Sequence, residues 1–171
     1  MTRRRGGFAL VRAFLVLALL PGAPVAHAET GPPAAGDPCP VELDGAMTQL
    51  PGGSEYLVCS APVWTPVPTP FPPNDTWLSY GPAITLHGQG FRNPNLTSGS
   101  WTATPLDDDT RCGATQVTVI EPGVLAPPVV TEADPQSSSG QPLNLEVLPK
   151  LFTIELTGHC LWTAANGWLM P

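Results

Sequence analysis

Residues 143–157, LNLEVLPKLFTIELT, carry the clearest structural pattern in this 171-residue sequence. Apolar and polar side chains alternate through 143–147 and again through 152–156, which gives each stretch one apolar face. Such alternation is typical of β-strands with one buried side, and we expect the two stretches to pair as an antiparallel hairpin. Pro149-Lys150 lies between them, and because proline cannot adopt a positive φ, the connection must be wider than a type I′ turn.

Shorter alternating stretches come earlier in the chain. They predict strands over 54–59, 83–87, 101–104 and 114–120. In the last of these, Val117 and Val119 are expected to face the core, with Gln116 and Thr118 on the opposite face. The 23 prolines disfavour long helices, because an interior proline removes a backbone donor and clashes with the preceding turn. The sequence therefore predicts an all-β chain, an antiparallel β-sandwich that is immunoglobulin-like in general shape.

Residues 1–28 have the pattern of a secretory signal peptide. Three arginines precede an apolar run over 13–20, and the small-x-small triplet Ala26-His27-Ala28 follows. We expect cleavage between Ala28 and Glu29, and the alternative is an uncleaved N-terminal anchor. The run is far shorter than the roughly 20 residues that span a bilayer, and no later segment is apolar enough to do so. The expected location is secreted or extracytoplasmic, in the cell envelope.

The charge balance changes when the leader is removed. Residues 29–171 keep three basic residues, Arg92, Arg111 and Lys150, against all 14 acidic ones, which is a formal net charge of −11 instead of −7. A chain this acidic is repelled by nucleic acid and by anionic membrane surfaces, so nucleic acid is not an expected partner. The acidity serves solubility, or it suits cations or a basic partner.

Two short features resemble known proteins. Residues 84–91, ITLHGQGF, are similar to the strand-Gly-x-Gly-Phe turn of many bacterial immunoglobulin-like modules, which implies the same fold. The leader, the scarcity of lysine and the Ala/Gly/Pro/Thr bias resemble small exported proteins of high-GC actinobacteria, including mycobacteria. This second resemblance is one of composition, and it implies no functional residues.

The exported part is expected to form one domain with accessory segments. These are a disordered arm at 29–37, an N-terminal disulfide loop unit at 38–60, a Pro-rich extended segment at 61–76, the β-sandwich at 77–163 and a C-terminal tail at 164–171. The Pro-rich segment is expected to be polyproline II and not a central strand.

Aromatic residues in these accessory segments leave two alternatives open. The Pro-rich segment is either a spacer or a stretch whose Trp64, Val67 and Phe71 pack on the domain, and its aromatic content favours packing. In the tail, Trp168 and Leu169 either fold back on the domain or contact a partner.

Four cysteines in an exported chain indicate two disulfides. We favour the pairs Cys39–Cys59 and Cys112–Cys160, with the other two connectivities left open. In the alternating pattern, Cys160 falls on the same side of its strand as the apolar residues at 152–156. Cys112 falls on the side opposite Val117 and Val119, and a bulge at Gly113 would be needed to bring it to their side. The sequence has no C-x₂-C pair, so a zinc site is not expected.

No catalytic constellation is recognisable in the sequence. His87 and His159 occupy polar positions of their alternating strands, and we expect them to face solvent. A triad with Ser54, Ser79 or Ser100 has no G-x-S-x-G elbow to support it. Two further carboxylates, Glu146 and Glu155, are expected on the exposed face of the hairpin, with no aromatic cleft around them.

The acidic cluster Asp107-Asp108-Asp109 is expected to be a solvated turn. Calcium is the alternative, but the spacing of calcium-binding loops is missing. We expect no cofactor and no metal. Asn74 and Asn95 match the N-glycosylation acceptor pattern, which matters only in a eukaryotic secretory pathway.

These observations favour a secreted, non-enzymatic β module that binds a partner, either a protein or another envelope component. A small secreted hydrolase with an atypical site is one alternative. An exported protease inhibitor, which would present the segment 59–62 beside a disulfide, is the other.

Overall fold

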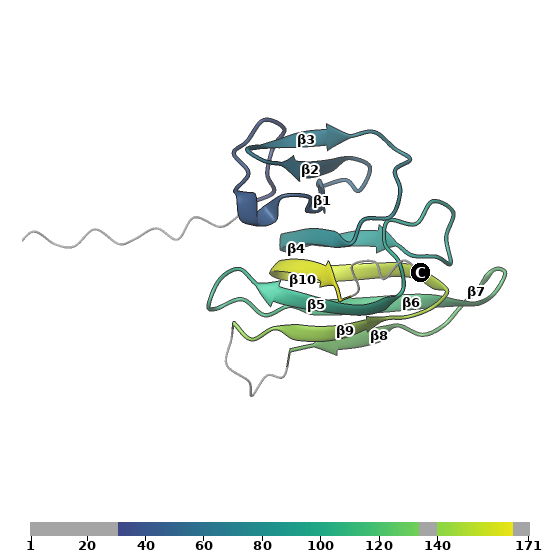
Figure 1. The fold of residues 1–171 in the computed structure, drawn as a ribbon. Coiled ribbons are helices and arrows are strands. Elements are labelled where there is room, and N and C mark those ends of the chain that lie inside the picture. Colours follow the sequence, from purple (N-terminus) through teal and green to yellow (C-terminus); the bar gives the residue numbers. More distant parts are fainter. Residues whose placement is uncertain (1–30, 134–139, 166–171) are drawn as a thin grey trace, which may run out of the picture.

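The computed structural model describes residues 31–133 and 140–165, and these residues are almost entirely strands and turns (Figure 1). The elements, in chain order, are the 3₁₀ turn η1 (Val41–Leu43) and the strands β1 (Met47–Gln49), β2 (Tyr56–Ser60), β3 (Val63–Val67), β4 (Thr76–His87), β5 (Gly99–Pro105), β6 (Gly113–Glu121), β7 (Val124–Leu125), β8 (Val129–Glu132), β9 (Leu143–Val147) and β10 (Leu151–Ala164). The described ranges hold no helix with the length and apolarity that a bilayer crossing needs.

The strands form one ten-stranded sheet built around β10. One edge of β10 pairs with β4 along nearly its whole length. Its other edge is shared, because residues 151–157 pair with β6 and residues 160–164 pair with β5. Two branches leave β10 in this way, β5–β9 and β6–β8, while β1, β2 and β3 extend the sheet from β4.

The all-β expectation is therefore confirmed, whereas a purely antiparallel arrangement is wrong. The sheet is mixed, because β1 runs parallel to β4 where Met47 pairs with Trp77. The parallel pair arises because β1, β2 and β3 form a meander that returns to β4 through the Pro-rich connection over 68–75. The strand order does not confirm an immunoglobulin-like topology.

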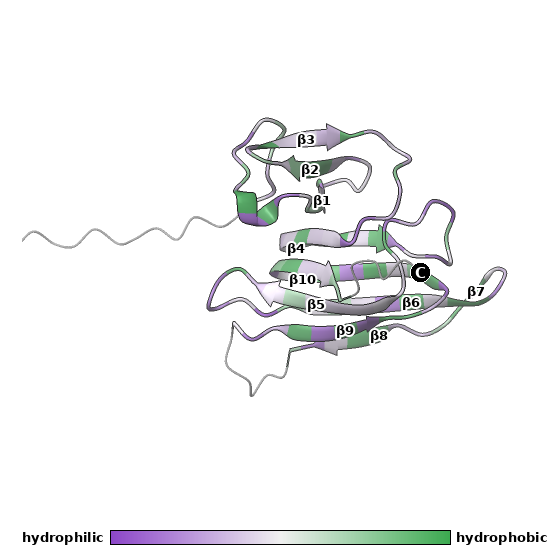
Figure 2. Cartoon of the chain, in the orientation of Figure 1, coloured by the Kyte–Doolittle hydropathy of each residue, from purple (hydrophilic) through white to green (hydrophobic). Residues whose placement is uncertain are grey.

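The expected hairpin between 143–147 and 152–156 is also wrong, although both stretches are strands. β9 pairs with β5, and β10 pairs with β4 and β6 instead of with β9. Both edges of β10 are thus occupied, so the chain crosses to another branch between the two strands. Lys150 in the connection has a φ of 56°, in the left-handed region. The alternating burial of both strands is as expected, and Figure 2 shows the matching alternation in hydropathy.

The buried face of β6 is the opposite of the expected one. Ala114 and Gln116 are buried, while Val117 and Val119 are half-exposed. The Gln116 carboxamide is hydrogen-bonded through both its nitrogen and its oxygen inside the core, since it donates to the Glu146 carbonyl oxygen of β9 and accepts from the Leu148 amide just after β9. Cys112 has the same parity as these buried residues, so it reaches Cys160 without a bulge at Gly113.

The N-terminal segments join the same sheet. The Pro-rich segment contains the edge strand β3, where Trp64 is buried in a small core with Leu57, Leu78 and the Cys39–Cys59 pair. Val67 and Phe71 pack against the main core instead. The prolines at 66, 68, 70 and 72 are exposed. The Pro-rich segment therefore packs on the domain through its apolar and aromatic side chains and is not a free spacer.

Candidate functional site

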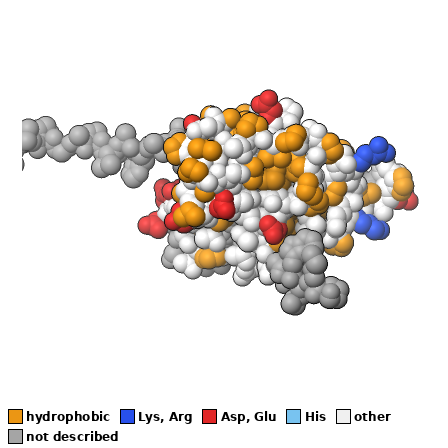
Figure 3. All heavy atoms as spheres, turned by 45° about the horizontal axis from the view of Figure 1, so that its top comes forward, with side chains coloured by type: hydrophobic (Ala, Val, Ile, Leu, Met, Phe, Trp, Pro, Cys, Tyr) orange, Lys and Arg blue, Asp and Glu red, His pale blue; other side chains and the backbone are white. Residues whose placement is uncertain are grey.

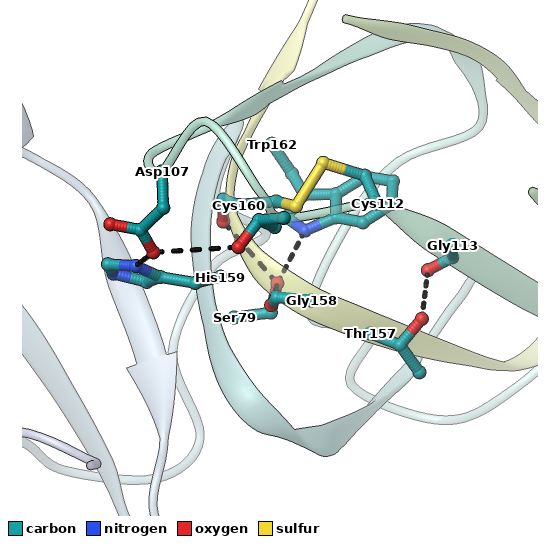
Figure 4. The surroundings of a disulfide bond; sticks show 10 residues. Ser79, Asp107, Cys112, Gly113, Thr157, Gly158, His159, Cys160 and Trp162 are labelled. Atoms are coloured by element: carbon teal, nitrogen blue, oxygen red, sulfur yellow. Dashed lines mark hydrogen bonds and ion pairs between the residues drawn. A yellow bond between two sulfur atoms is a disulfide. The ribbon is translucent and has the colours of Figure 1, made fainter. Parts of the chain in front are cut away.

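His159 and Asp107 form a close polar pair beside the second disulfide (Figure 4). The His159 Nδ1 lies 2.6 Å from the Asp107 Oδ2, and their side chains are 18% and 44% exposed. His159 extends from β10, and Asp107 comes from the turn after β5, where the Leu106 amide donates to the His159 carbonyl oxygen. His159 is therefore a partly buried, oriented imidazole and not the solvent-facing residue that the sequence predicts.

No serine of the described part completes a triad with this pair. Ser79 is buried, where its hydroxyl donates to the Gly158 carbonyl oxygen at 2.6 Å and accepts from the Trp162 indole at 2.9 Å. Ser100 donates to Glu146 on the exposed side of β9, and Ser54 lies in the exposed loop after β1. None of the three serines bonds to His159, so the Asp107–His159 pair lacks a nucleophile among the residues described.

Glu146 and Glu155 are not brought together either. Glu146 lies on β9, paired with Ser100 of β5, while Glu155 lies on β10 between Thr85 and Thr115. Both are exposed, but they occupy different branches of the sheet. The pairing of strands thus provides no carboxylate pair for glycoside hydrolysis.

His87 sits in an aromatic cluster at the end of β4. Its ring stacks on Phe91, with centroids 4.1 Å apart, and both rings meet the edge or face of Phe152. Asn95 bonds both backbone groups of His87. Its buried side-chain oxygen accepts from the His87 amide, and its own backbone amide donates to the His87 carbonyl oxygen. The His87 Nδ1 is buried and has no hydrogen-bond partner among the described atoms. This histidine is also not solvent-facing.

A shallow groove of about 470 Å³ runs beside His87. Its walls are the loop 50–53 and the outer edge of β4 over 82–87, with Gln49 and Tyr80 at its base. The Gln49 carboxamide bonds both the amide and the carbonyl of Thr85, and so covers the strand edge as a neighbouring strand would. The groove contains no nucleophile paired with a base.

The remaining polar candidates are structural or solvent-exposed. Asp107, Asp108 and Asp109 form an exposed turn, and the described residues contain no group of His, Cys, Asp and Glu that could hold a metal ion. Asn95 is buried, and the Asn74 amide donates to the Gly45 and Thr76 carbonyl oxygens. Neither asparagine therefore presents a free side chain for glycosylation.

Both disulfides have the favoured connectivity. Cys39 pairs with Cys59 and Cys112 with Cys160, with Cα–Cα separations of 5.8 Å and 6.0 Å, and the described residues include no free cysteine. The segment 60–62 beside the first disulfide is a tight β2–β3 turn, pinned where the Ala61 amide donates to Asp44. Ala28, Glu29, Trp168 and Leu169 lie outside the described residues.

Exposed aliphatic side chains gather on β6, β7 and β8, which we call the apolar arm. Its members, which are 41–60% exposed, are Ile120, Val124, Leu125, Val129 and Val130. They lie on neighbouring strands, because both β7 and β8 pair with β6, and consecutive members such as Val129 and Val130 point to opposite faces. Figure 1 shows the β6–β7 hairpin projecting beyond the rest of the sheet. The sequence pattern did not indicate this arm, because alternation predicts no strand between 121 and 142.

Neither family models nor curated proteins nor solved structures match this chain. The site is therefore interpreted from its own geometry. Among the described residues, the feature that most needs a functional explanation is the apolar arm, since single exposed apolar residues are ordinary, whereas several on neighbouring strands point to a contact region.

Proposed function

We propose that the chain is an exported, non-enzymatic β module that binds a partner in the cell envelope or the extracellular space. The apolar arm supports this proposal most directly, because five neighbouring aliphatic side chains face solvent on adjacent strands. Burial of such side chains against a partner is the usual way to remove them from water. The signal-peptide pattern of residues 1–28 and the two disulfides support export.

The scaffold also suits a binding role. Two disulfides and two core clusters hold the strands, and the Gln116 side chain joins the β6 branch to the β9 backbone. We propose that the β5–β9 and β6–β8 branches pack as the layers of a β-sandwich around this contact. Such a scaffold presents the apolar arm in one fixed conformation, which lowers the entropic cost of binding.

The two alternative functions have less support. A hydrolase needs an activated nucleophile, and within residues 31–133 and 140–165 no serine hydroxyl is bonded to His87 or His159. An inhibitor of the expected kind would present 59–62 as a rigid loop, whereas Cys59 and Ser60 belong to β2, where they pair with β3.

Binding to washed cell envelopes tests the proposal. The chain is purified after export, its N-terminus is determined by mass spectrometry, and it is incubated with envelopes and sedimented. We expect the wild type to sediment and Leu125→Asp to stay in the supernatant, with equal melting temperatures because Leu125 is exposed. Val41→Asp is the matched control, since it makes the same kind of change at a valine of η1 that is 71% exposed and lies outside the arm. Equal sedimentation of wild type and Leu125→Asp would reject the proposal.

A further inference from the structure

We infer that the projecting end of the module docks on an anionic lipid surface. The surface concerned, called the tip, consists of Phe91, Arg92, Ile120, Val124, Leu125 and Lys150. This inference rests on the proposed function, and it names the envelope component as lipid. Three separate segments build the tip: the loop after β4, the β6–β7 hairpin and the β9–β10 connection.

The three segments meet at the backbone of Lys150 and Leu151. The Gly90 amide donates to the Leu151 carbonyl oxygen at 2.7 Å, and on the other side the Val119 amide donates to the Lys150 carbonyl oxygen at 2.9 Å. A Cβ on Gly90 would overlap the Lys150 carbonyl oxygen, and one on Gly88 would lie 2.5 Å from the Leu151 Cβ. The Gly-x-Gly of the sequence is therefore explained by this close approach. It fixes the loop with Phe91 and Arg92 beside Lys150.

The tip combines apolar and basic side chains. Phe91, Ile120, Val124 and Leu125 are each at least 41% exposed. Arg92 and Lys150 are exposed, and they are two of the three basic residues after residue 28. Figure 3 shows, at one end of the molecule, a projection with apolar atoms that is flanked by two basic groups. Apolar side chains ringed by basic ones are the combination that binds at the interface of anionic membranes.

The net negative charge of the chain is expected to repel anionic membranes, but the tip is locally an exception, where charge complementarity favours an anionic surface over a basic partner. Residues 88–95, 118–126 and 148–152 contain two basic residues and one acidic residue, Glu121, although the whole chain has 14 acidic residues. At physiological salt the Debye length is about 8 Å, so acidic groups farther along the sheet are largely screened from a surface at the tip. The net negative charge then orients the module with its tip toward the membrane.

The shape of the tip distinguishes lipid from a folded protein partner. The β6–β7 hairpin projects beyond the end of the sheet (Figure 1). A fluid interface accommodates an apolar projection, whereas a protein partner would need a matching pocket. The groove at 470 Å³ is lined by loop 50–53 and β4 and includes none of the tip residues.

The backbone conformation of Lys150 supports a role of its side chain in membrane binding. Only Asn93 and Lys150 have a positive φ among the described non-glycine residues, and both belong to the tip segments or their loops. Asparagine tolerates the left-handed region, whereas lysine is strained there by roughly 1–2 kcal/mol. The ammonium group explains why a strained position carries lysine.

Protein-free vesicles test the inference. The exported chain, with its N-terminus verified, is sedimented with vesicles of phosphatidylglycerol and phosphatidylcholine in equal parts, and with vesicles of phosphatidylcholine alone. We expect binding to the mixed vesicles that weakens with salt, and at least tenfold weaker binding to phosphatidylcholine. Lys150→Asn removes the charge and relieves the strained φ, so it should lower affinity about fivefold without loss of stability.

Three more variants make the result decisive. Leu125→Asp should reduce vesicle binding at least about tenfold, because a buried aliphatic contact is replaced by a charge repelled by the lipid. Glu121→Gln should increase binding to the mixed vesicles about fivefold, a gain that unfolding cannot imitate. Val41→Asp in η1, at a valine that is 71% exposed and lies outside both the apolar arm and the tip, should leave vesicle binding unchanged.

The outcomes separate the two proposals. If washed envelopes bind the chain but neither vesicle does, the lipid assignment is overturned, a protein or polysaccharide is the partner, and the proposed function stands. If neither envelopes nor vesicles bind, both proposals fail. If Glu121→Gln and Lys150→Asn both leave vesicle binding unchanged, the assignment of the tip as the lipid-binding surface is also overturned.

Discussion

Gly158 of β10 packs directly against the carbonyl group of Arg111. A Cβ on Gly158 would overlap the Arg111 carbonyl oxygen and would lie 3.0 Å from the Cys160 Sγ. Gly158 has a φ of 85°, and it sits where β10 stops pairing with β6 and begins pairing with β5. The residue thus allows one strand to serve both branches of the sheet, and it brings Cys112 to Cys160.

Gly158→Ala should therefore be strongly destabilising. The alanine is strained at positive φ and also overlaps backbone, and together these effects should lower the free energy of unfolding by roughly 2–4 kcal/mol. Gly123→Ala is the control, because its φ is 82° but nothing lies within 4 Å of the added Cβ. The control should lose about 1 kcal/mol. Urea denaturation measures both, and equal losses would contradict the role given to the Arg111 contact.

Local pattern was sufficient for part of this fold. Alternation predicted strands in 143–147 and 152–156, and four cysteines behind a signal-peptide pattern predicted two disulfides. Partner strands were not predictable in the same way, because periodicity says which face is buried but not which edge pairs. β1 had no alternation to detect, since Thr48 and Gln49 are buried polar residues satisfied by Leu78 and Thr85.

The tip was harder still to predict from the sequence. Phe91, Leu125 and Lys150 come from three segments that only the tertiary pairing joins. One signal was present, because a Gly-x-Gly after a strand indicates a close approach of two backbones. The sequence did not reveal that the approaching backbone belongs to Lys150.

Gln116→Met should destabilise the chain although methionine is apolar and similar in size. The Glu146 carbonyl and the Leu148 amide would lose their partner at a place where the glutamine is 2% exposed. A buried unsatisfied group costs roughly 1–3 kcal/mol, and the hydrophobic gain of methionine offsets only part of that. Gln141→Met, at an exposed position before β9, is the control and should be neutral. Thermal unfolding followed by circular dichroism compares them.

Removing each disulfide should affect different parts of the chain. Replacing Cys39 and Cys59 by alanine should expose β1–β3 to proteolysis, because the small core around Trp64 includes both cysteines. Replacing Cys112 and Cys160 should lower the stability of the whole sheet, since the bond links the entry to β6 with β10. Each loss should be about 2–4 kcal/mol.

Limited proteolysis with mass spectrometry distinguishes these results. Early cleavage confined to 31–68 is expected for the first pair, and cleavage throughout the chain for the second. The same fragment pattern in both variants would contradict two separately stabilised regions.

The stability of the chain should fall above pH 10 because of Tyr80. Burial raises the pKa of the Tyr80 hydroxyl above its ordinary value of 10.0, since the phenolate is poorly solvated in the core. The native state then holds this proton more tightly than the unfolded state does. The stabilisation is fully present below pH 10 and is lost as the pH rises through the raised native pKa.

Tyr80→Phe tests this assignment by removing the titrating group. The variant loses the hydrogen bond to the Gln49 carbonyl oxygen, so it should be about 1 kcal/mol less stable at neutral pH. Its free energy of unfolding should nevertheless decline less steeply above pH 10 than that of the wild type. Urea denaturation from pH 8 upward gives both slopes, and the ultraviolet absorbance of tyrosinate identifies the step, because Tyr56 is the only other tyrosine in the sequence. Parallel slopes would mean that Tyr80 is not the group responsible.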